Sequence, residues 1–419
     1  MGSLLGILGL FTLLSIALLL SENRSAINFK TVLYGLIFQL IFALFILKTP
    51  FGAPIFSFLD QSINILIGFS SSGSDFLFKS YIDGVGFHPG LINFAFSTLP
   101  TIIFFSSLVA VLYHFGVLQT IIKFIARRMQ LTLGTSGSET LSVAGNIFLG
   151  QTESPLMVRP FVSKMTKSEL MAVMTGGFAT VSGGVLAIYV SWLTDIQGIA
   201  GHLLAASVMS APAALVVAKI IYPEIEKSQT MGDVNVNIEQ TNINAMEALS
   251  NGATDGLKLA ANIAAMLIAF ISFVAMVNYF LSFGGTSMEE IFGVIFRPLA
   301  WTMGVPWNEA QLVGMLMGKK IVLTELVAYG DLQNLIRDGM ISERSAIIST
   351  YALCGFSNFA SIGIQLGGIG AMAPERKKDL AKLVTKAMFG GAIASWLTAT
   401  IAGLLLSKIK KFFFYFFSW

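Results

Sequence analysis

Charged residues are scarce in this sequence, and their scarcity excludes an ordinary water-soluble protein. Asp, Glu, Lys and Arg make up 12% of the 419 residues, about half of the roughly 25% usual in globular domains. Apolar residues make up 55%, and several runs are long enough to cross about 30 Å of hydrocarbon. The net charge of +3 is too small to indicate a nucleic-acid partner. The composition predicts an all-helical, polytopic membrane protein.

Cysteine and histidine are almost missing. One cysteine, Cys354, excludes an intramolecular disulfide. The three histidines, His88, His114 and His202, cannot form a convincing metal cluster, and we assign them no role. The usual zinc-hydrolase and serine-hydrolase motifs, His-Glu-x-x-His and Gly-x-Ser-x-Gly, are absent. We predict that the protein is not an enzyme, with an intramembrane hydrolase using buried glutamates as the alternative.

Eight apolar runs predict eight transmembrane helices. The first run lacks a preceding basic stretch and a clear cleavage site, so we interpret it as a retained helix with its N-terminus outside, since Arg24 and Lys30 follow it. The predicted helices are residues 3–21, 30–48, 92–116, 168–194, 200–221, 255–282, 343–370 and 382–407.

Two further segments are not predicted to span the membrane. Residues 49–90 carry Pro, Gly and Ser clusters and predict an external connection with one amphipathic piece, 55–69. Residues 118–131 place basic side chains opposite an apolar helical face. This pattern predicts a helix in the cytoplasmic interface, with a frayed end of the preceding helix as the alternative.

A polar break interrupts the apolar segment 141–162. It reads Gly150-Gln151-Thr152-Glu153-Ser154-Pro155. Each flanking arm has only about 12 residues, too few to span at 1.5 Å per residue. Basic residues follow the second arm. We therefore predict a re-entrant hairpin that enters from the cytoplasm and has its tip near the midplane.

The second half of the chain repeats the first in the opposite orientation. A polar linker, 223–250, separates two halves with the same order of helix, amphipathic helix, hairpin, interrupted helix and helix. Thr152-Glu153 in the first hairpin matches Thr324-Glu325 in the second, and Gly177-Phe178-Ala179-Thr180 matches Gly355-Phe356-Ser357-Asn358. Such inverted repeats are typical of secondary transporters with a site near the midplane. The predicted segments are 1–90, 91–222, 223–250, 251–408 and a C-terminal tail, 409–419.

The two glutamates are the sharpest candidates for a site. A carboxylate near the bilayer centre costs about 2.5–3.5 kcal/mol on insertion scales, and such groups usually mark a substrate or ion path. Glu153 and Glu325 each lie at a helix break. The structural alternative is an ion pair with Lys319, Lys320 or Arg159.

Polar residues near the breaks add ligand groups. Gln151 and Thr152 present donors and acceptors, or merely cap the second arm. Asn358 and Ser361 are three residues apart and share a helix face, so with a carboxylate they suit a polyhydroxyl group, or else form an interhelical hydrogen bond. Phe356 alone indicates packing more than binding.

A cation site is predicted beside the first tip. Asn146 and Thr180 offer side-chain oxygens, and the Leu149 and Val181 carbonyls freed at the breaks complete a set suited to sodium. The alternatives are a cap or interhelical bond for Asn146 and close glycine packing around Thr180.

Several motifs together resemble the concentrative nucleoside transporter family. They are Asn146 to Pro155 followed by Val158-Arg159-Pro160-Phe161, Gly304-Val305-Pro306-Trp307-Asn308-Glu309, and Cys354-Gly355-Phe356-Ser357-Asn358. The resemblance extends from the third predicted helix to the eighth, with the basic turn after the first. It implies a homotrimer in the inner membrane, each protomer with eight transmembrane helices and two re-entrant hairpins.

The resemblance also implies a function and roles for residues. The function is nucleoside uptake driven by sodium, with a transport domain moving against a trimeric scaffold. Gln151, Thr152 and Glu153 would face the base, while Glu325, Asn358 and Ser361 would bind the ribose. Phe356, Val185 and Leu259 would form apolar walls, and Asn146, Leu149, Thr180 and Val181 would hold sodium.

The sequence departs from the family pattern at two places. Thr324 stands where the family usually has Asn, and Thr180 stands where Ser is common. Glu325 is kept beside Thr324, so ribose binding is still expected, and Thr180 keeps a hydroxyl that can bind a cation. Some relatives use protons, so proton coupling is the alternative to sodium coupling.

Overall fold

The computed structural model describes residues 2–49, 52–80, 88, 91, 93–232 and 242–406. Within these residues the chain is helical, with a single isolated β-bridge between Ser136 and Met231. The predicted all-helical class is confirmed. The predicted C-terminal tail, 409–419, and part of the linker lie outside the described residues.

Among its described residues, the first half contains ten α-helices. They are α1 (Gly2–Leu19), α2 (Phe29–Lys48), α3 (Gly52–Phe78), α4 (Leu99–His114), α5 (Val117–Leu133), α6 (Gly137–Gly145), α7 (Arg159–Val162), α8 (Lys167–Ala179), α9 (Gly183–Trp192) and α10 (Ile199–Ile221). The second half contains α11 (Ala245–Ser282), α12 (Met288–Thr302), α13 (Ala310–Val322), α14 (Glu325–Arg337), α15 (Glu343–Leu353), α16 (Phe359–Met372) and α17 (Lys377–Leu406).

Six helical segments of the described chain are long and apolar enough to cross a membrane, and two shorter apolar helices accompany them. The shorter helices are Leu4–Leu19 and Phe359–Met372. Together the eight apolar segments fall on the eight predicted helices. The helix of residues 118–131 is also present, as α5, and its two ends are marked by left-handed glycines, Gly116 and Gly134.

The predicted amphipathic piece, 55–69, lies within α3, a continuous helix of 27 residues, so the connection is helical beyond both ends of that piece. The serine cluster does not break it. Ser62, Ser71 and Ser74 each donate to the carbonyl four residues earlier. A serine that bonds back in this way remains compatible with a helix.

The two interrupted helices are fully broken in the structure. α8 and α9 are separated at residues 180–182, and α15 and α16 at residues 354–358. Gly355 has a φ of 108°, and a Cβ there would lie 2.6 Å from the Phe178 carbonyl oxygen, so the second break requires glycine. The motif pairing in the sequence is shifted, because Gly177-Phe178-Ala179 ends α8 whereas Gly355-Phe356-Ser357 lies between helices. The cap residues Thr180 and Cys354 are the structural counterparts.

The two predicted hairpins differ in their second arms. In the first hairpin, Ser136 and Glu139 form a capping box that starts α6, but the return arm is a 3₁₀ turn, Ser154–Val158, followed by α7. Pro155 and Pro160 remove backbone donors there. In the second hairpin both arms are α-helices of 13 residues, α13 and α14, and Thr324 caps the second.

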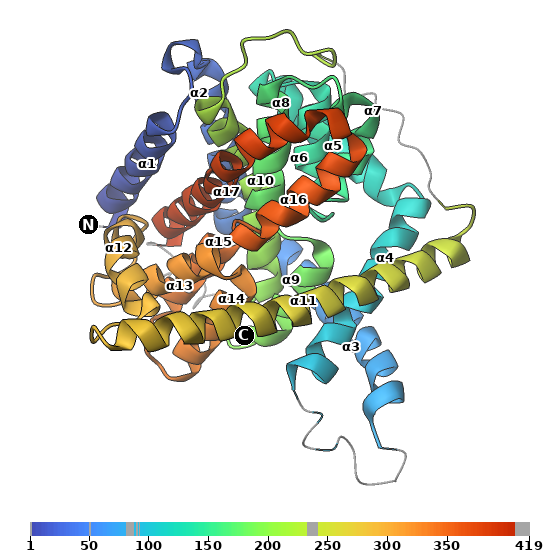
Figure 1. The fold of residues 1–419 in the computed structure, drawn as a ribbon, viewed down its shortest axis with the longest axis vertical. Coiled ribbons are helices and arrows are strands. Elements are labelled where there is room, and N and C mark those ends of the chain that lie inside the picture. The colour runs from blue at the N-terminus through green and yellow to red at the C-terminus, as the bar shows by residue number, and fades with distance from the viewer. Residues whose placement is uncertain are drawn as a thin grey trace.

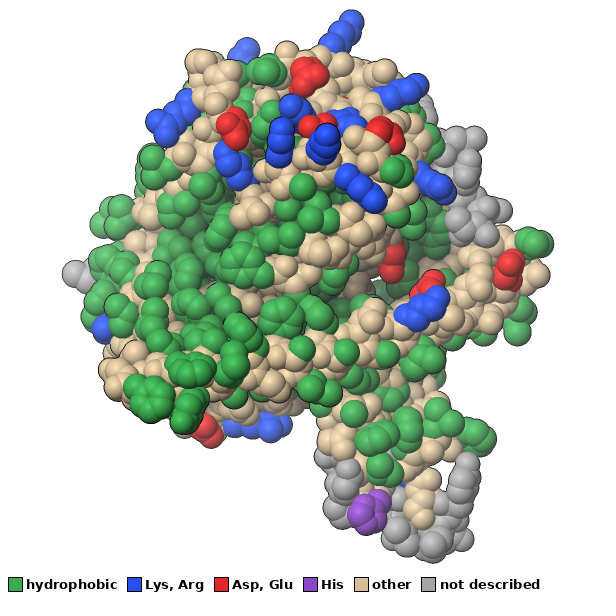
Figure 2. Space-filling model, viewed as in Figure 1, with side chains coloured by type: hydrophobic (Ala, Val, Ile, Leu, Met, Phe, Trp, Pro, Cys, Tyr) green, Lys and Arg blue, Asp and Glu red, His purple; other side chains and the backbone are tan. Residues whose placement is uncertain are grey.

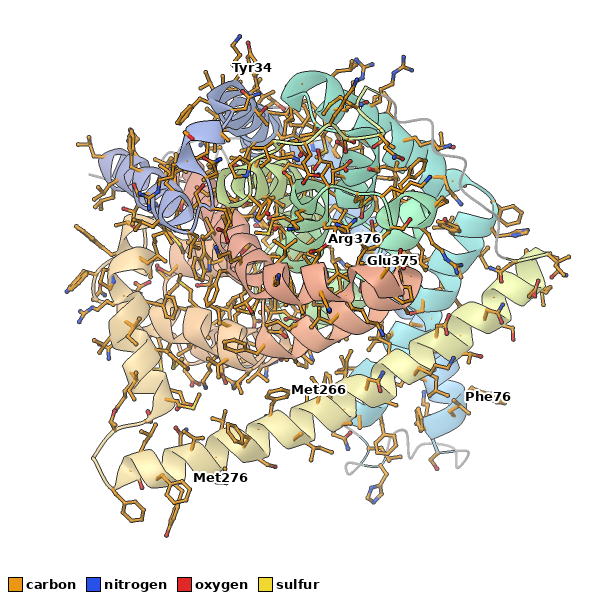
Figure 3. The ribbon with its side chains drawn as sticks, turned by 45° about the horizontal axis from the view of Figure 1, so that its top comes forward. Tyr34, Phe76, Met266, Met276, Glu375 and Arg376 are labelled. Atoms are coloured by element: carbon orange, nitrogen blue, oxygen red, sulfur yellow. The ribbon has the colours of Figure 1, made fainter. Side chains whose placement is uncertain are left out.

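Figure 1 shows α10, α8 and α17 in the middle of the molecule and the long α11 across its outside. Figure 3 shows the same separation from another side, with the half-exposed Met276 on α11. α11 packs on α4 through Gly252 and Gly256, where a Cβ would lie 2.7 Å from the Ser107 and Ile103 Cα atoms. Only the small residues allow this approach.

Lys and Arg side chains gather at the top of the molecule, where α5, α7 and the start of α17 lie (Figure 2). There Arg376 donates to the Ser163 and Met165 carbonyls, and Lys386 pairs with Glu22. The positive-inside rule makes this end cytoplasmic.

Candidate functional site

The tip of the first hairpin is held against α16 by side-chain amides. Gln151 donates from Nε2 to the Ser361 hydroxyl at 3.2 Å, and Gln365 donates to the Gln151 Oε1 at 3.1 Å and to the Met174 carbonyl. All three polar side chains are buried. Thr152 lies beside Gly368, where a Cβ would come within 2.6 Å of the Thr152 methyl.

The second tip places Glu325 against two other elements. Its Oε1 accepts from the Tyr189 hydroxyl of α9 at 2.8 Å, and its Oε2 accepts from Asn358 Nδ2 at 2.8 Å. Asn358 is the N-cap of α16 and accepts from the Ser361 amide, so one side chain caps a helix and holds a carboxylate. Hydrogen bonds donated to a carboxylate belong to the stronger, charge-assisted class.

In the described part of the chain, Glu153 and Glu325 do not form the ion pairs that were the structural alternative. Lys319 pairs instead with Glu289 and Asp331, and Lys320 donates to backbone carbonyls. Glu153 accepts from the Gly150 amide and closes the tip turn. Among these residues, no side chain of opposite charge lies within 4.0 Å of either carboxylate.

Glu153 is exposed and faces a cavity of about 490 Å³. The cavity lies between the first hairpin and the α4–α11 pair and reaches Asn242 and Asn251 at the cytoplasmic start of α11. Of the predicted substrate residues it includes Glu153 and Leu259, and of the predicted sodium ligands Leu149. The remaining predicted groups lie behind it: Gln151, Val185, Glu325, Asn358 and Ser361 are buried, while Thr152 and Phe356 are half-buried.

The predicted cation ligands leave oxygen atoms open. Asn146 is 0% exposed, and its Nδ2 donates to the Ser142 carbonyl one turn back, which leaves the buried Oδ1 with no partner in the described chain. The Thr180 hydroxyl likewise donates to the Gly176 carbonyl. No described donor bonds the Leu149 or Val181 carbonyl oxygen. A buried acceptor without a partner costs about 1–3 kcal/mol, so this oxygen set fits a cation.

Hydrogen bonds to backbone carbonyls connect the helix breaks of both repeats with the tip of the first hairpin. The Gly183 amide donates to the Phe148 carbonyl at 3.1 Å, the Phe356 amide to the Thr180 carbonyl at 3.3 Å, and the Ser357 hydroxyl to the Phe178 carbonyl at 2.7 Å. The predicted substrate and cation groups therefore occupy one junction.

Two polar residues of this junction were missed from the sequence. Gln365 follows Ser361 by four residues, so the helical spacing from Asn358 through Ser361 was a usable signal. Tyr189 is a lone tyrosine in an apolar helix and gives no such pattern. Its 4.2 Å ring stacking on Tyr329 depends on the tertiary fold.

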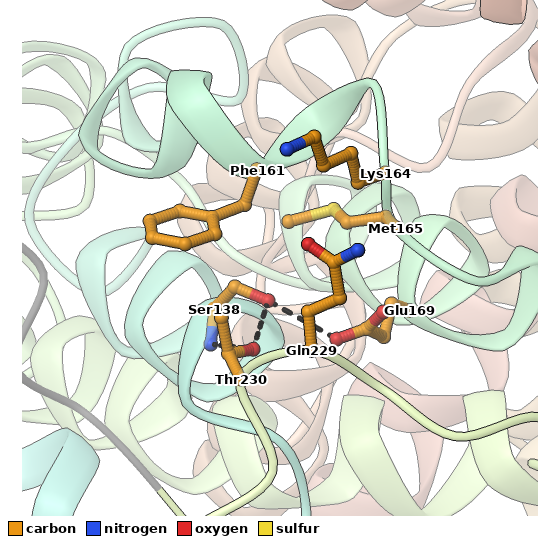
Figure 4. A pocket seen from close by; sticks show the side chains of 7 residues that line it. All are labelled: Ser138, Phe161, Lys164, Met165, Glu169, Gln229 and Thr230. Carbon is orange, nitrogen blue, oxygen red and sulfur yellow. Dashed lines mark hydrogen bonds between the residues drawn. The ribbon is translucent and has the colours of Figure 1, made fainter.

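A second polar cluster lies at the cytoplasmic base of the first hairpin (Figure 4). Glu169 accepts from the Ser136, Ser138 and Ser228 hydroxyls, and Ser138 also bonds Thr230. The Gly137 amide donates to the Thr230 carbonyl. The linker segment 228–231 is thus attached to the hairpin rather than being a simple connection.

Three family models match the chain in sequence. They describe the Na+ dependent nucleoside transporter N-terminus (residues 8–81), nucleoside recognition (95–194) and the Na+ dependent nucleoside transporter C-terminus (202–403).

Curated relatives match over nearly all of the chain. It is 41% identical over 414 residues to an uncharacterized transporter, YutK, of Bacillus subtilis, covering 97% of this chain and 100% of that protein. It is 42% identical to sodium/nucleoside cotransporter 2 of Rattus norvegicus and 41% identical to sodium/nucleoside cotransporter 1 of Homo sapiens, covering 92% of this chain. The chain spans 60% and 61% of those two longer proteins.

Solved structures share the fold. CNTnw in an inward-facing substrate-bound state superposes with a TM-score of 0.89 at 40% identity, covering 97% of this chain and 99% of that one. A double variant of CNTnw in an outward-facing state superposes with a TM-score of 0.88 at 39% identity, covering 97% and 98%.

Proposed function

The chain belongs to the family of Na+ dependent, or concentrative, nucleoside transporters, and from that premise we propose that it imports nucleosides by sodium symport. It is a transporter and not an enzyme. Its place is the inner membrane, where we propose a homotrimer whose transport domains move against a shared scaffold. The same fold in inward-facing and outward-facing relatives supports alternating access.

The substrate roles follow the two tips. Gln151, Thr152 and Glu153 face the base, while Glu325, Asn358 and Ser361 bind the ribose. A carboxylate that already accepts two hydrogen bonds at 2.8 Å has the geometry to accept ribose hydroxyls. Val185, Leu259 and Phe356 supply apolar walls. Because Gln151 and Ser361 bond one another, an entering nucleoside exchanges these contacts for its own.

The observation that carries the sodium proposal is the buried Asn146 Oδ1 without a partner. Thr180 and the Leu149 and Val181 carbonyls complete a hard oxygen set around it. Because Asn146, Leu149 and Gln151 belong to the first hairpin, while Thr180 and Val181 lie at the break between α8 and α9, sodium joins the hairpin to the break and orders the tip that contacts the base. Binding of the ion and of the substrate is therefore coupled, and each raises the affinity of the other.

The test is initial uptake of radiolabelled uridine into liposomes containing the purified protein. Replacing sodium by choline should reduce uptake at least about tenfold. Each of the variants Glu153→Gln and Glu325→Gln should also reduce uptake at least about tenfold, the loss expected when one charge-assisted hydrogen bond is removed. Uptake that follows a proton gradient and ignores sodium would support the proton-coupled alternative. Full uptake in both variants would contradict the assigned roles.

A further inference from the structure

Lys320 is a fully buried lysine that the substrate site does not use. It lies in the last turn of α13, the first arm of the second hairpin, and is 0% exposed. Its ammonium donates to the Ala352 carbonyl at 2.9 Å, the Cys354 carbonyl at 2.9 Å and the Ser395 hydroxyl at 2.8 Å. All three donors of the ammonium are therefore satisfied.

The groups around the ammonium are neutral oxygens at a helix end. α15 ends at Leu353, so its last carbonyls lack intrahelical donors. A helix C-terminus also carries partial negative charge that favours a cation. In the part of the chain that the structure describes, no carboxylate lies within 4.0 Å of the ammonium, and Glu325 attracts it from a longer distance. Two carbonyls and a hydroxyl thus hold a monovalent cation, which is the donor set of an alkali-metal site.

The first repeat has a similar break, without a lysine. There α8 ends at Ala179, Asn146 caps the C-terminus of α6 on the first arm of the hairpin, and the Phe148 carbonyl of that arm accepts from the Gly183 amide at the break. Among the described residues no Lys or Arg bonds to this break, and Asn146 Oδ1 remains without a partner. One repeat supplies its own cation, and the other leaves its oxygens open.

We infer that Lys320 is a tethered cation that permanently fills the second repeat's counterpart of the sodium site. This inference rests on the proposed sodium symport. The Lys320 ammonium fixes the break between α15 and α16, and so positions Asn358, in every state of the cycle. Only the first repeat's break then depends on a free ion, so the sodium gradient acts through one of two related sites.

Two variants of Lys320 distinguish the effect of its charge from the effect of the volume that its side chain fills. Lys320→Met fills the volume without charge, and no ion can enter. Lys320→Ala removes the side chain and leaves the oxygen cage open to a free cation. Lys319→Met is the matched control, because the neighbouring Lys319 pairs with Glu289 and Asp331 outside the cage.

The measurements are sodium-dependent uridine uptake in liposomes and melting temperature in detergent with sodium, methylammonium or choline. We expect Lys320→Met to reduce uptake at least about tenfold at every sodium concentration, because the three buried oxygens that accept from the ammonium are then unpaired. Lys320→Ala should recover melting temperature with sodium or methylammonium, and its Hill coefficient for sodium should rise by about one. Lys319→Met leaves the cage and its ammonium intact, so its uptake should keep the wild-type dependence on sodium concentration.

Two results would overturn the inference: Lys320→Met with wild-type uptake and melting temperature, or Lys320→Ala and Lys320→Met with the same response to added cations. If both variants are unfolded and no cation restores Lys320→Ala, a free ion cannot replace the ammonium, and the inference also fails. Wild-type protein without sodium-driven uptake would instead contradict the proposed function itself.

Discussion

Tyr189 contacts Glu325 in the proposed ribose site, and the sequence did not predict this contact. Its hydroxyl is the second side-chain partner of Glu325, beside Asn358, and comes from α9, outside both hairpins. The bond fixes the carboxylate's direction before substrate arrives, and preorganised groups lose less entropy on binding.

Tyr189→Phe tests this role. Losing a hydrogen bond to a charged group costs about 1.5–3 kcal/mol, so the KM for uridine should rise at least about tenfold while maximal uptake changes little. Tyr329→Phe is the matched control, since it stacks on Tyr189 but donates to the Thr350 carbonyl. Equal effects of the two variants would show a general packing role and contradict positioning.

Single residues differed in how well the sequence predicted them. Glu153 and Glu325 stood out because an ionisable residue beside a break in an apolar run is rare and costly. Tyr189 and the double use of Asn358 could not be predicted, because both depend on contacts between segments more than 30 residues apart. Whether the nine proposed substrate residues and four sodium ligands act as assigned stays a prediction.

At the scale of elements, the sequence predicted the breaks and their order. The positions of Gly and Pro residues located the two hairpins. The distribution of basic residues predicted that the hairpins enter the membrane from opposite sides. The predicted amphipathic piece 55–69 is shorter than α3, because serines that bond back to the helix resemble a loop in composition. The attachment of residues 228–231 to the first hairpin could not be predicted, because it depends on tertiary hydrogen bonds to Ser138 and Gly137.

The base of the first hairpin depends on a buried ion pair. Lys219 of α10 lies 2.7 Å from Glu139 of α6 and also donates to Ser168 of α8. Lys219→Met would leave the Glu139 carboxylate uncompensated, and breaking a buried pair in this way costs about 3–5 kcal/mol. We expect a clear fall in melting temperature in detergent.

The control for this prediction is Lys227→Met, an exposed position in the linker, which should leave the melting temperature unchanged. The double variant Lys219→Met/Glu139→Gln should recover part of the loss, because it removes the unpaired charge. A Lys219→Met protein as heat-stable as the control would mean that the pair does not hold the hairpin base.

At the scale of the whole molecule, the two repeats share one plan and differ in their cations. Each places a hairpin tip against the break of the following helix. The first break offers open oxygens, and the second is closed by Lys320. The cavity beside Glu153 extends to Asn242 of the predicted cytoplasmic linker and to Asn251 near the start of α11. The resemblance predicted from the hairpin motifs is confirmed for the family and the fold.

The central claim is that a sodium gradient does work on a nucleoside through this junction. The most direct measurement is net uridine movement in liposomes with equal uridine on both sides, equal pH and an imposed sodium gradient. We predict accumulation when sodium is higher outside, efflux when the gradient is reversed, and no movement in Asn146→Leu, which lacks the open oxygen. Unchanged uridine on both sides in wild-type vesicles that still exchange labelled uridine would contradict the account.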